Sequence, residues 1–383
     1  MKIIFVSNVL NHHQKPISEA LYKVTNGEYR FVATAELTEE RKALGFERMH
    51  PNYLLEYSAD NAHYINDLIE NADLVIIGAA PLCLIKERLK LGKLTFRYSE
   101  RLFKTKSRYL KWPIHFWRAF QTRSCYILCS SAFASKDFMS TGFYKGKCFK
   151  WGYFPQVKVH DNLEKLIANK GAQGQNQISI VWAARLLPLK HPEYVIQVAK
   201  RLKKQSISFV MHLIGNGQLE VELHKNIIAD GLEKEVIMHG AMSPDMVRMY
   251  MEQADIFLFT SDRQEGWGAV VNEAMNSACA VVASHAAGSV PFLIAHGENG
   301  LIFKSGDVDD LYNKVLFLIN NPDRRKDIGL KAYKTMIQTW NAENCVNNLI
   351  ELVDAIEHSK DCSNICGPCS KAPYLKENWI TSI

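Results

Sequence analysis

Residues Ile256 to Ala283 have the sequence IFLFTSDRQEGWGAVVNEAMNSACAVVA, which indicates the class of fold most clearly. Two short apolar runs at residues 256–260 and 280–283 have the length of buried strands. A glycine-containing loop and a segment of helical period lie between them. Because strands that alternate with helices form parallel sheets covered on both faces, this stretch predicts an α/β fold.

The same alternation extends through the rest of the chain. Further strands are predicted at residues 2–6, 29–34, 73–77, 126–129, 178–183, 209–214 and 236–239. Ser243 is expected to cap a helix that has Pro244 at its first position. Because so many strands alternate with helices, we expect two Rossmann-like doubly wound sheets that face each other across a cleft, where the carboxyl ends of the strands bind ligands.

Length and composition support two folded domains. The chain has 383 residues, of which 47% are hydrophobic and 22% charged, and this excludes disorder and fibres. We expect domains at residues 1–165 and 176–340, with a final helix and tail at 341–383 that packs back toward the first domain. Residues 152–177, with Gly171 and Gly174, are predicted to contain the linker.

The sequence has no apolar segment long enough to span a membrane and nothing after Met1 that resembles a secretory signal. Nine cysteines without an export signal favour a reduced, cytoplasmic setting. Cys362, Cys366 and Cys369 could hold a metal ion, but a fourth ligand is missing from the pattern, and a reduced tail is the alternative.

Two glutamates flank the loop between the strands quoted above. Glu265 and Glu273 are eight residues apart, or about 12 Å if both lie on a helix. Gly266 and Gly268 allow close approach of backbone N–H groups to an anion at the start of that helix. Since carboxylates accept hydrogen bonds from sugar hydroxyls, the spacing suits a nucleotide-sugar, with the hexose near Glu265 and the ribose near Glu273. Solvated glutamates are the alternative.

A basic pair and a second glycine loop follow two other predicted strands. Arg185 and Lys190 come after residues 178–183, where two cations could neutralise a diphosphate, although surface charges are the commoner fate of such residues. Gly215 and Gly217 form another close-approach turn, which lacks the third glycine of the dinucleotide-binding fingerprint.

Five motifs in this order resemble the donor-binding half of the retaining nucleotide-sugar glycosyltransferases of family 4, which have the GT-B fold. They are Ala184-Arg185 through Lys190-His191-Pro192, Ile214 to Gly217, Ala254-Asp255-Ile256, Glu265 to Met275, and Gly297 to Leu301. The chain departs from the family at Ala278-Cys279-Ala280 and at Ser289 to Phe292. These departures affect the identity of the donor sugar more than phosphate binding.

The resemblance implies catalytic roles for Glu265, Arg185 and Lys190, and no metal ion or other cofactor. Implied donor contacts are Glu273, Gly215, Gly217, His239, Gly240, Gly266, Trp267, Gly268, Ala269 and Val270. The expected reaction is transfer of a hexosyl unit with retention, from a UDP-sugar or alternatively a GDP-sugar, to a sugar or lipid-linked glycan in cell-surface polysaccharide assembly. A nucleotide-sugar hydrolase or epimerase, and an inactive module that binds nucleotide or an anionic surface, remain alternatives.

Polar residues of the first half could contact an acceptor or the donor sugar. Asn8, His12 and His13 follow the first predicted strand, where a polar helix cap is the alternative. His115 lies in an aromatic stretch, and a packed histidine is the alternative there.

The net charge of +6 conceals a strong asymmetry. Residues 84–150 hold 16 Lys and Arg against three acidic residues, with aromatic residues between them. Such a segment suits an anionic lipid surface or a lipid diphosphate acceptor, so we expect a peripheral protein at the cytoplasmic face of a membrane. Nucleic acid is the competing partner, but no nucleic-acid motif accompanies the charges, and a merely solvated face is the further alternative.

Overall fold

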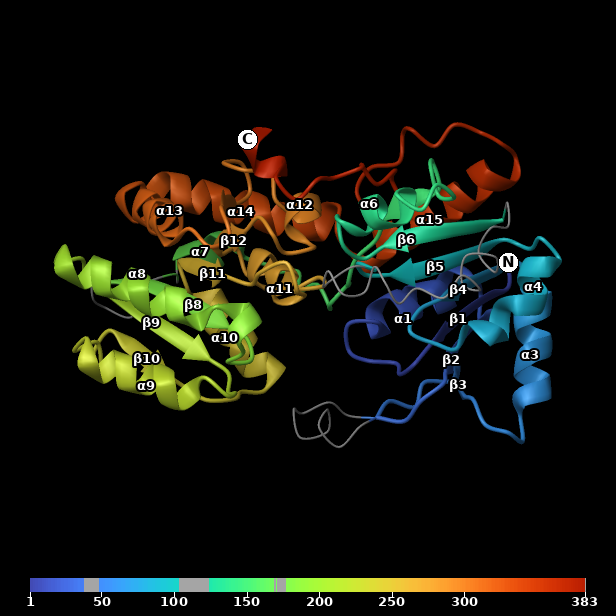
Figure 1. The fold of residues 1–383 in the computed structure, drawn as a ribbon, viewed down its shortest axis with the longest axis horizontal. Coiled ribbons are helices and arrows are strands. Elements are labelled where there is room, and N and C mark those ends of the chain that lie inside the picture. The colour runs from blue at the N-terminus through green and yellow to red at the C-terminus, as the bar shows by residue number, and fades with distance from the viewer. Residues whose placement is uncertain (38–47, 103–123, 169, 171–176, 383) are drawn as a thin grey trace. The chain divides into compact units, whose positions relative to one another are not determined.

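The computed structural model describes residues 1–37, 48–102, 124–168, 170 and 177–382 (Figure 1). The predictions for His115, for Gly171 and Gly174, and for the part of the basic segment at 103–123 lie outside the described residues. The chain forms two compact units, of which the first comprises Met1–Gln156 and Trp340–Lys376 and the second Val157–Thr339 and Glu377–Ile383. The first change of unit therefore falls within the predicted linker segment 152–177.

The first unit is built on a parallel sheet of seven strands in the order β3-β2-β1-β4-β5-β6-β7. The strands are β1 (Ile3–Ser7), β2 (Tyr29–Ala33), β3 (Leu54–Glu56), β4 (Leu74–Ile77), β5 (Thr95–Ser99), β6 (Cys125–Cys129) and β7 (Cys148–Lys150). Its helices are α1 (Lys15–Val24), α3 (Ala62–Asn71), η1 (Leu82–Ile85), α4 (Lys86–Lys90), α6 (Ala134–Met139) and α15 (Ala342–Glu357). Every side chain of β1 and β4 is buried, as expected for central strands with helices on both faces.

The second unit holds a parallel sheet of six strands in the order β10-β9-β8-β11-β12-β13. Its strands are β8 (Ile178–Ala183), β9 (Phe209–Ile214), β10 (Val236–Met238), β11 (Ile256–Phe259), β12 (Ala280–Ser284) and β13 (Leu301–Phe303). Its helices are α7 (Leu163–Ala168), η3 (Pro188–Lys190), α8 (Pro192–Lys204), α9 (Glu220–Ala229), α10 (Pro244–Gln253), α11 (Val270–Asn276), α12 (Val290–Leu293), α13 (Val308–Asn320), α14 (Pro322–Gln338) and η4 (Trp379–Ser382).

All nine predicted strands are present, with ends that differ by no more than one residue. In the described part of the chain, four further strands were not predicted. Three of them, β3, β7 and β13, have only three residues each, which is too short for a recognisable apolar pattern, and β5 (TFRYS) mixes apolar with polar and charged side chains. The predicted cap is confirmed, because the Met246 N–H donates to Ser243 Oγ over 3.4 Å.

Residues Trp340–Lys376 belong to the first unit, as predicted for the final helix. Helix α15, red in Figure 1, packs against α1 near the other end of the sequence. The tail then pairs with the edge strand β7, where the Cys369 N–H donates to Lys150 O and the Lys150 N–H donates to Ser370 O, both over 2.7 Å. This pairing covers backbone groups that an edge strand would otherwise expose. Cys369 is buried beside Cys345, whereas Cys366 is exposed, so these thiols lie in different surroundings.

Part of the basic segment is internal. Arg88 is fully buried and donates to the carbonyl groups of Ala72 and Leu94, each over 2.6 Å. Arg101 is also buried and lies 3.5 Å from Asp137. The expectation that the segment's charges face an anionic surface is therefore wrong for these two residues. Among the described helices, none has both the length and the apolar character needed to cross a bilayer.

Candidate functional site

The candidate residues of the second unit gather at the carboxyl ends of three adjacent strands. Strand β8 lies between β9 and β11 in the sheet. The loop after β8 carries Arg185 and Lys190, the loop after β9 carries Gly215 and Gly217, and the loop after β11 carries Glu265. Because parallel strands place their carboxyl ends at the same edge, residues far apart in sequence meet here. The side chain of Arg185 is exposed at this edge.

The two glycines after β9 pack against the loop after β8. Their φ angles are +138° and +153°, and a Cβ atom would lie 1.9 Å from Ala184 O at Gly215 and 2.6 Å from Leu186 O at Gly217. The Leu186 N–H also donates to Asn216 O over 2.8 Å. Glycine is therefore required at both positions so that the two loops can approach each other.

Lys190 and Glu265 form an ion pair in which Lys190 Nζ donates to Glu265 Oε2. Their side chains are only 15% and 13% exposed. The backbone of the lysine is held as well, because Thr260 Oγ1 donates to Lys190 O and accepts a 2.9 Å bond from Trp182 Nε1. The ends of β8 and β11 thus bring a cation and a carboxylate together in a partly desolvated place, where their charges interact more strongly than in water.

Glu265 lies in the loop before helix α11, which begins only at Val270. The assumption that Glu265 and Glu273 share one helix, on which their expected separation of about 12 Å was based, is therefore wrong. Glu273 lies on α11 and is half-buried. Residues 265–268 lie outside the helix, and Ala269 is the N-cap of α11, so the motif opens a helix as predicted but only at its fifth residue.

The aromatic and glycine residues of this loop are packed against the core. Trp267 is 1% exposed, and its Nε1 donates to Asn272 Oδ1 over 2.9 Å. Gly268 has φ +85°, and a Cβ there would lie 2.2 Å from Cζ of Phe259. The buried indole of Trp267 therefore ties the loop before α11 to Asn272 of that helix.

His239 and Gly240 follow β10, the strand that lies beside β9 in the sheet. His212 Nδ1 and His239 Nε2 are 2.9 Å apart, and both rings pack against Tyr250 of α10. Burial lowers the pKa of His239, and burial together with the neighbouring His239 lowers the pKa of His212 to about 4. The pair is therefore neutral at physiological pH. Gly240 joins it to the glycine loop, since its carbonyl accepts a 2.7 Å bond from Gly215 N–H.

His191, which was not predicted as a site residue, follows Lys190 directly. Its backbone is left-handed, with φ 49° and ψ 52°, and it precedes helix α8. Its Nδ1 lies 2.7 Å from Glu193 Oε1, and its Nε2 lies 3.5 Å from Asp262 Oδ2. Contacts with Asp262 and Glu193 raise the pKa of His191 to about 9. The Lys190-His191-Pro192 order was visible in the sequence, but Asp262 is brought to it only by the fold.

In the first unit, the candidate residues Asn8, His12 and His13 follow strand β1. The turn is closed by Asn11, whose Oδ1 accepts hydrogen bonds from the backbone N–H groups of His13 and Gln14, over 3.0 and 3.2 Å. The two imidazole centroids are 3.7 Å apart, and the His13 ring stacks on Tyr153 at 5.8 Å. The side chain of Asn11, and not that of either histidine, thus holds the turn that precedes α1, whose own N-cap residue is Gln14.

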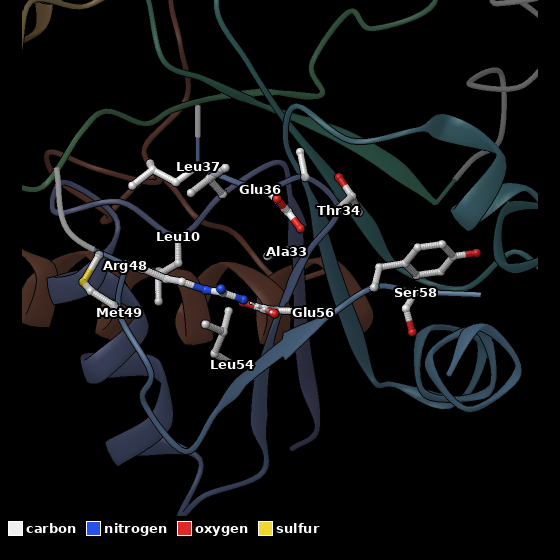
Figure 2. A pocket seen from close by; sticks show the side chains of 13 residues that line it. Leu10, Ala33, Thr34, Glu36, Leu37, Arg48, Met49, Leu54, Glu56 and Ser58 are labelled. Carbon is white, nitrogen blue, oxygen red and sulfur yellow. Dashed lines mark hydrogen bonds and ion pairs between the residues drawn. The ribbon is translucent and has the colours of Figure 1, made fainter. Parts of the chain in front are cut away.

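A pocket of about 300 Å³ opens beside this loop, at the carboxyl ends of β1, β2 and β3 (Figure 2). Figure 2 shows the Arg48 guanidinium pointing at the carboxylate of Glu56, to which it donates with Nε and Nη2 over 2.5 to 3.1 Å. The sequence analysis missed this pocket because its lining comes from separate segments. It is lined by Val9, Leu10, Ala33, Thr34, Ala35, Glu36, Leu37, Arg48, Met49, Leu54, Glu56, Tyr57 and Ser58.

Solved structures share this architecture over nearly the whole chain. The protein HepE of Anabaena, crystallised in complex with UDP, superposes with a TM-score of 0.68 at 17% identity, covering 93% of this chain and 100% of that one. The lipopolysaccharide outer core galactosyltransferase WaaB superposes with a TM-score of 0.61 at 17% identity, covering 88% of this chain and 99% of that one. The predicted GT-B fold, with two Rossmann-like parallel-sheet domains, is confirmed.

Sequence relatives match about half of this chain. The amylovoran biosynthesis glycosyltransferase AmsK of Erwinia amylovora is 30% identical over 185 residues, covering 47% of this chain and 45% of the relative. The poly(ribitol-phosphate) alpha-N-acetylglucosaminyltransferase of Staphylococcus aureus (strain COL) is 26% identical over 199 residues, covering 52% of this chain and 38% of the relative. The chain thus matches less than half the length of either. Residues 164–335, which lie in the second unit, match the family described as glycosyl transferases group 1.

Proposed function

We propose that the protein is a retaining glycosyltransferase that moves a hexosyl unit from a nucleoside-diphosphate sugar to a sugar or lipid-linked glycan. The observation that carries this proposal is the meeting of Lys190 and Glu265 at the carboxyl edge of the domain that matches glycosyl transferases group 1. Its setting in polysaccharide assembly is supported by the relative named for amylovoran biosynthesis. A UDP-sugar is the favoured donor because a protein of the same fold was crystallised with UDP.

The roles of the charged residues follow from what a diphosphate leaving group needs. Lys190 and Arg185 would hold the diphosphate and stabilise the charge that develops as it leaves, so no metal ion is required for that purpose. Donor binding would move Lys190 from Glu265 to the phosphate oxygens. Glu265 would then accept hydrogen bonds from hydroxyls of the hexose, and Glu273 from the ribose. Backbone groups around Gly268 and Gly240 would complete donor contact.

Acceptor attack on the same face as the departing diphosphate would give retention. Catalysis would then consist of holding both substrates in place and stabilising the leaving charge, because no protein nucleophile is needed. Anomeric analysis of the product by NMR tests retention, and activity in the presence of a chelator tests metal independence. An inverted product would refute the first statement, and loss of activity that added metal restores would refute the second.

The acceptor is proposed to bind in the first unit, at the pocket beside Asn8 and the two histidines. Glu36, Glu56 and Arg48 supply acceptors and donors for the hydroxyl groups of a sugar, and Tyr57 supplies a ring. The exposed basic residues of the segment 84–150 are proposed to contact anionic lipid, without Arg88 and Arg101. Flotation with anionic and neutral vesicles at low and high salt tests this, and absence of binding to anionic vesicles at low salt would refute it.

The main experiment is a thermal-shift screen of UDP-, GDP- and ADP-sugars, followed by transfer assays with the donor that stabilises most. A ligand that binds only the folded state increases the free energy of unfolding in proportion to the logarithm of its concentration over its dissociation constant, and this raises the unfolding temperature. Transfer that depends on an added acceptor supports the proposal. Release of free sugar without an acceptor would indicate a hydrolase, and nucleotide binding without any turnover would indicate an inactive binding module.

A further inference from the structure

His191 adopts a backbone conformation that a side chain disfavours. Its φ of 49° and ψ of 52° lie in the left-handed region, where glycine is the residue normally preferred. Positive φ in a residue other than glycine persists only where the surroundings over-determine it, and such residues concentrate at functional sites. The contacts of the His191 imidazole must therefore offset the free-energy cost of this backbone conformation.

The imidazole bridges two carboxylates that come from different elements. Glu193 belongs to the first turn of α8, and its Oε1 lies 2.7 Å from Nδ1. Asp262 belongs to the loop after β11, and its Oδ2 lies 3.5 Å from Nε2. The ring also stacks on Tyr194, with centroids 4.6 Å apart and planes at 12°. A protonated imidazole can donate to both carboxylates at once, which a neutral one cannot do.

This bridge lies next to the proposed diphosphate contact. His191 directly follows Lys190 in the chain, and the Asp262 N–H donates to Leu189 O over 2.9 Å on the other side of the lysine. Asp262 is three residues from Glu265, the partner of Lys190. The loop after β8 and the loop after β11 are therefore joined by a backbone bond and by the imidazole, with the Lys190 and Glu265 ion pair between them.

We propose that His191 is a positioning residue whose charged imidazole ties the loop of Lys190 to the loop of Glu265 and so sets the affinity for the donor diphosphate. This inference rests on the proposed function, because it concerns the same site. Charge matters as well as geometry. With His191 protonated, the three groups His191, Glu193 and Asp262 carry one net negative charge, and with His191 neutral they carry two, which opposes an anionic ligand.

The charge of His191 also gives the inference a pH signature. The charged groups that face the ring are Asp262 from the loop after β11 and Glu193 from α8, with the Tyr194 phenol against its face. These contacts raise its pKa to about 9. A raised pKa means that the bridge is intact at neutral pH and is lost as the pH rises through about 9.

The test is UDP binding by isothermal titration calorimetry to the wild-type protein and to His191→Gly, His191→Arg and Ser206→Gly, between pH 7 and pH 10. His191→Gly suits the backbone and removes the bridge, so UDP should bind about tenfold more weakly at pH 7, as expected for loss of a charge-assisted contact. His191→Arg keeps a positive charge and should retain most of the affinity. Ser206 has φ 56° and follows α8, so Ser206→Gly is a matched control that changes the backbone preference elsewhere and should bind as wild type.

The pH profile separates positioning from a merely structural role. Wild-type affinity should fall as the pH rises through about 9, and neither His191→Gly nor His191→Arg should show that step. If wild-type protein binds UDP and His191→Gly binds it equally well with the same pH profile, the inference is overturned and the proposed function stands. If the wild-type protein binds none of UDP, GDP and ADP, the proposed function fails and the inference falls with it.

Discussion

Lys190 Nζ donates to Glu265 Oε2, although 75 residues separate the two in the sequence. The pair joins the loops at the carboxyl ends of β8 and β11, which are neighbouring strands. The side chains of this lysine and glutamate are mostly buried and neutralise each other, so both could exchange partners when an anionic ligand with hydroxyl groups binds. Each then has a ligand group of matching chemistry, so neither has to remain unpaired in the bound state.

Neutralising Glu265 or truncating Lys190 should abolish most of the turnover. Glu265→Gln and Lys190→Ala are each expected to lower kcat by about 100-fold or more, because each loses a contact aimed at the developing charge or at the sugar. Steady-state kinetics measures the effect, and circular dichroism checks that the fold survives. Lys200→Ala is the matched control, since Lys200 pairs with Asp230 on the exposed side of α8. Near-normal turnover in both site variants would refute the assignment.

Gly215 should not tolerate a side chain. In Gly215→Ala the new Cβ would lie 1.9 Å from Ala184 O, a backbone atom that can move only if the loop after β8 moves. We expect a loss of about 3 kcal/mol or more in the free energy of unfolding, as is typical of severe steric conflict. Urea denaturation measures it.

Gly231→Ala is the control for that experiment. Gly231 has φ +65°, but a Cβ there would meet nothing within 4 Å. Gly231→Ala should therefore lower the free energy of unfolding by only about 1 to 2 kcal/mol, the cost of placing a side chain on a left-handed backbone. Equal losses in the free energy of unfolding for the two variants would show that the close approach at Gly215 does not affect stability.

The His212 and His239 pair should make the protein less stable in acid. The pKa of His212 is lowered to about 4, whereas an unfolded histidine titrates near pH 6.5. Between these values the unfolded state binds more protons, so the contribution to stability is complete above about pH 6.5 and is lost as the pH falls toward 4. Denaturation of wild type and His212→Gln at several pH values measures this, and the variant should lose less stability on acidification. If wild type and His212→Gln lost the same stability on acidification, this prediction would be wrong.

The pocket of the first unit should affect the acceptor and not the donor. Glu56→Gln keeps the shape of the side chain but weakens its bonds to sugar hydroxyls and to Arg48. We expect the KM for the acceptor to rise about tenfold while the KM for the donor is unchanged. Stability should change by no more than about 1 kcal/mol, because both side chains are half-exposed.

Glu87→Gln is the matched control for the pocket. Glu87 forms an exposed ion pair with Lys90 on α4 of the same unit, away from the pocket lining. It should leave both KM values unchanged. Glu56→Gln with an unchanged acceptor KM would refute the acceptor role of the pocket.

The sequence alone was sufficient for the parts of this protein that depend on local pattern. The run IFLF of β11 is recognisable as a buried strand because all four side chains are apolar and all four are buried. The cap by Ser243 and the first-position Pro244 depend on neighbouring residues and were equally readable. The glycine loop, the two glutamates and the basic pair were recognisable from their order along the chain. Their order also revealed the resemblance to a glycosyltransferase domain.

The contacts between these side chains became known only from the tertiary structure. Glu265 lies in the loop before α11, which begins at Val270, and the residues between them, Trp267 and Gly268, pack on the core. The bridge from His191 to Asp262 and the ion pair of Arg48 with Glu56 join segments that no periodic pattern connects. Such contacts depend on strand order and on loop packing, which are non-local, whereas strands and caps depend on residues a few positions apart. The sequence therefore determined the class of fold and the chemical groups, and only the folded chain determined the partners of those groups.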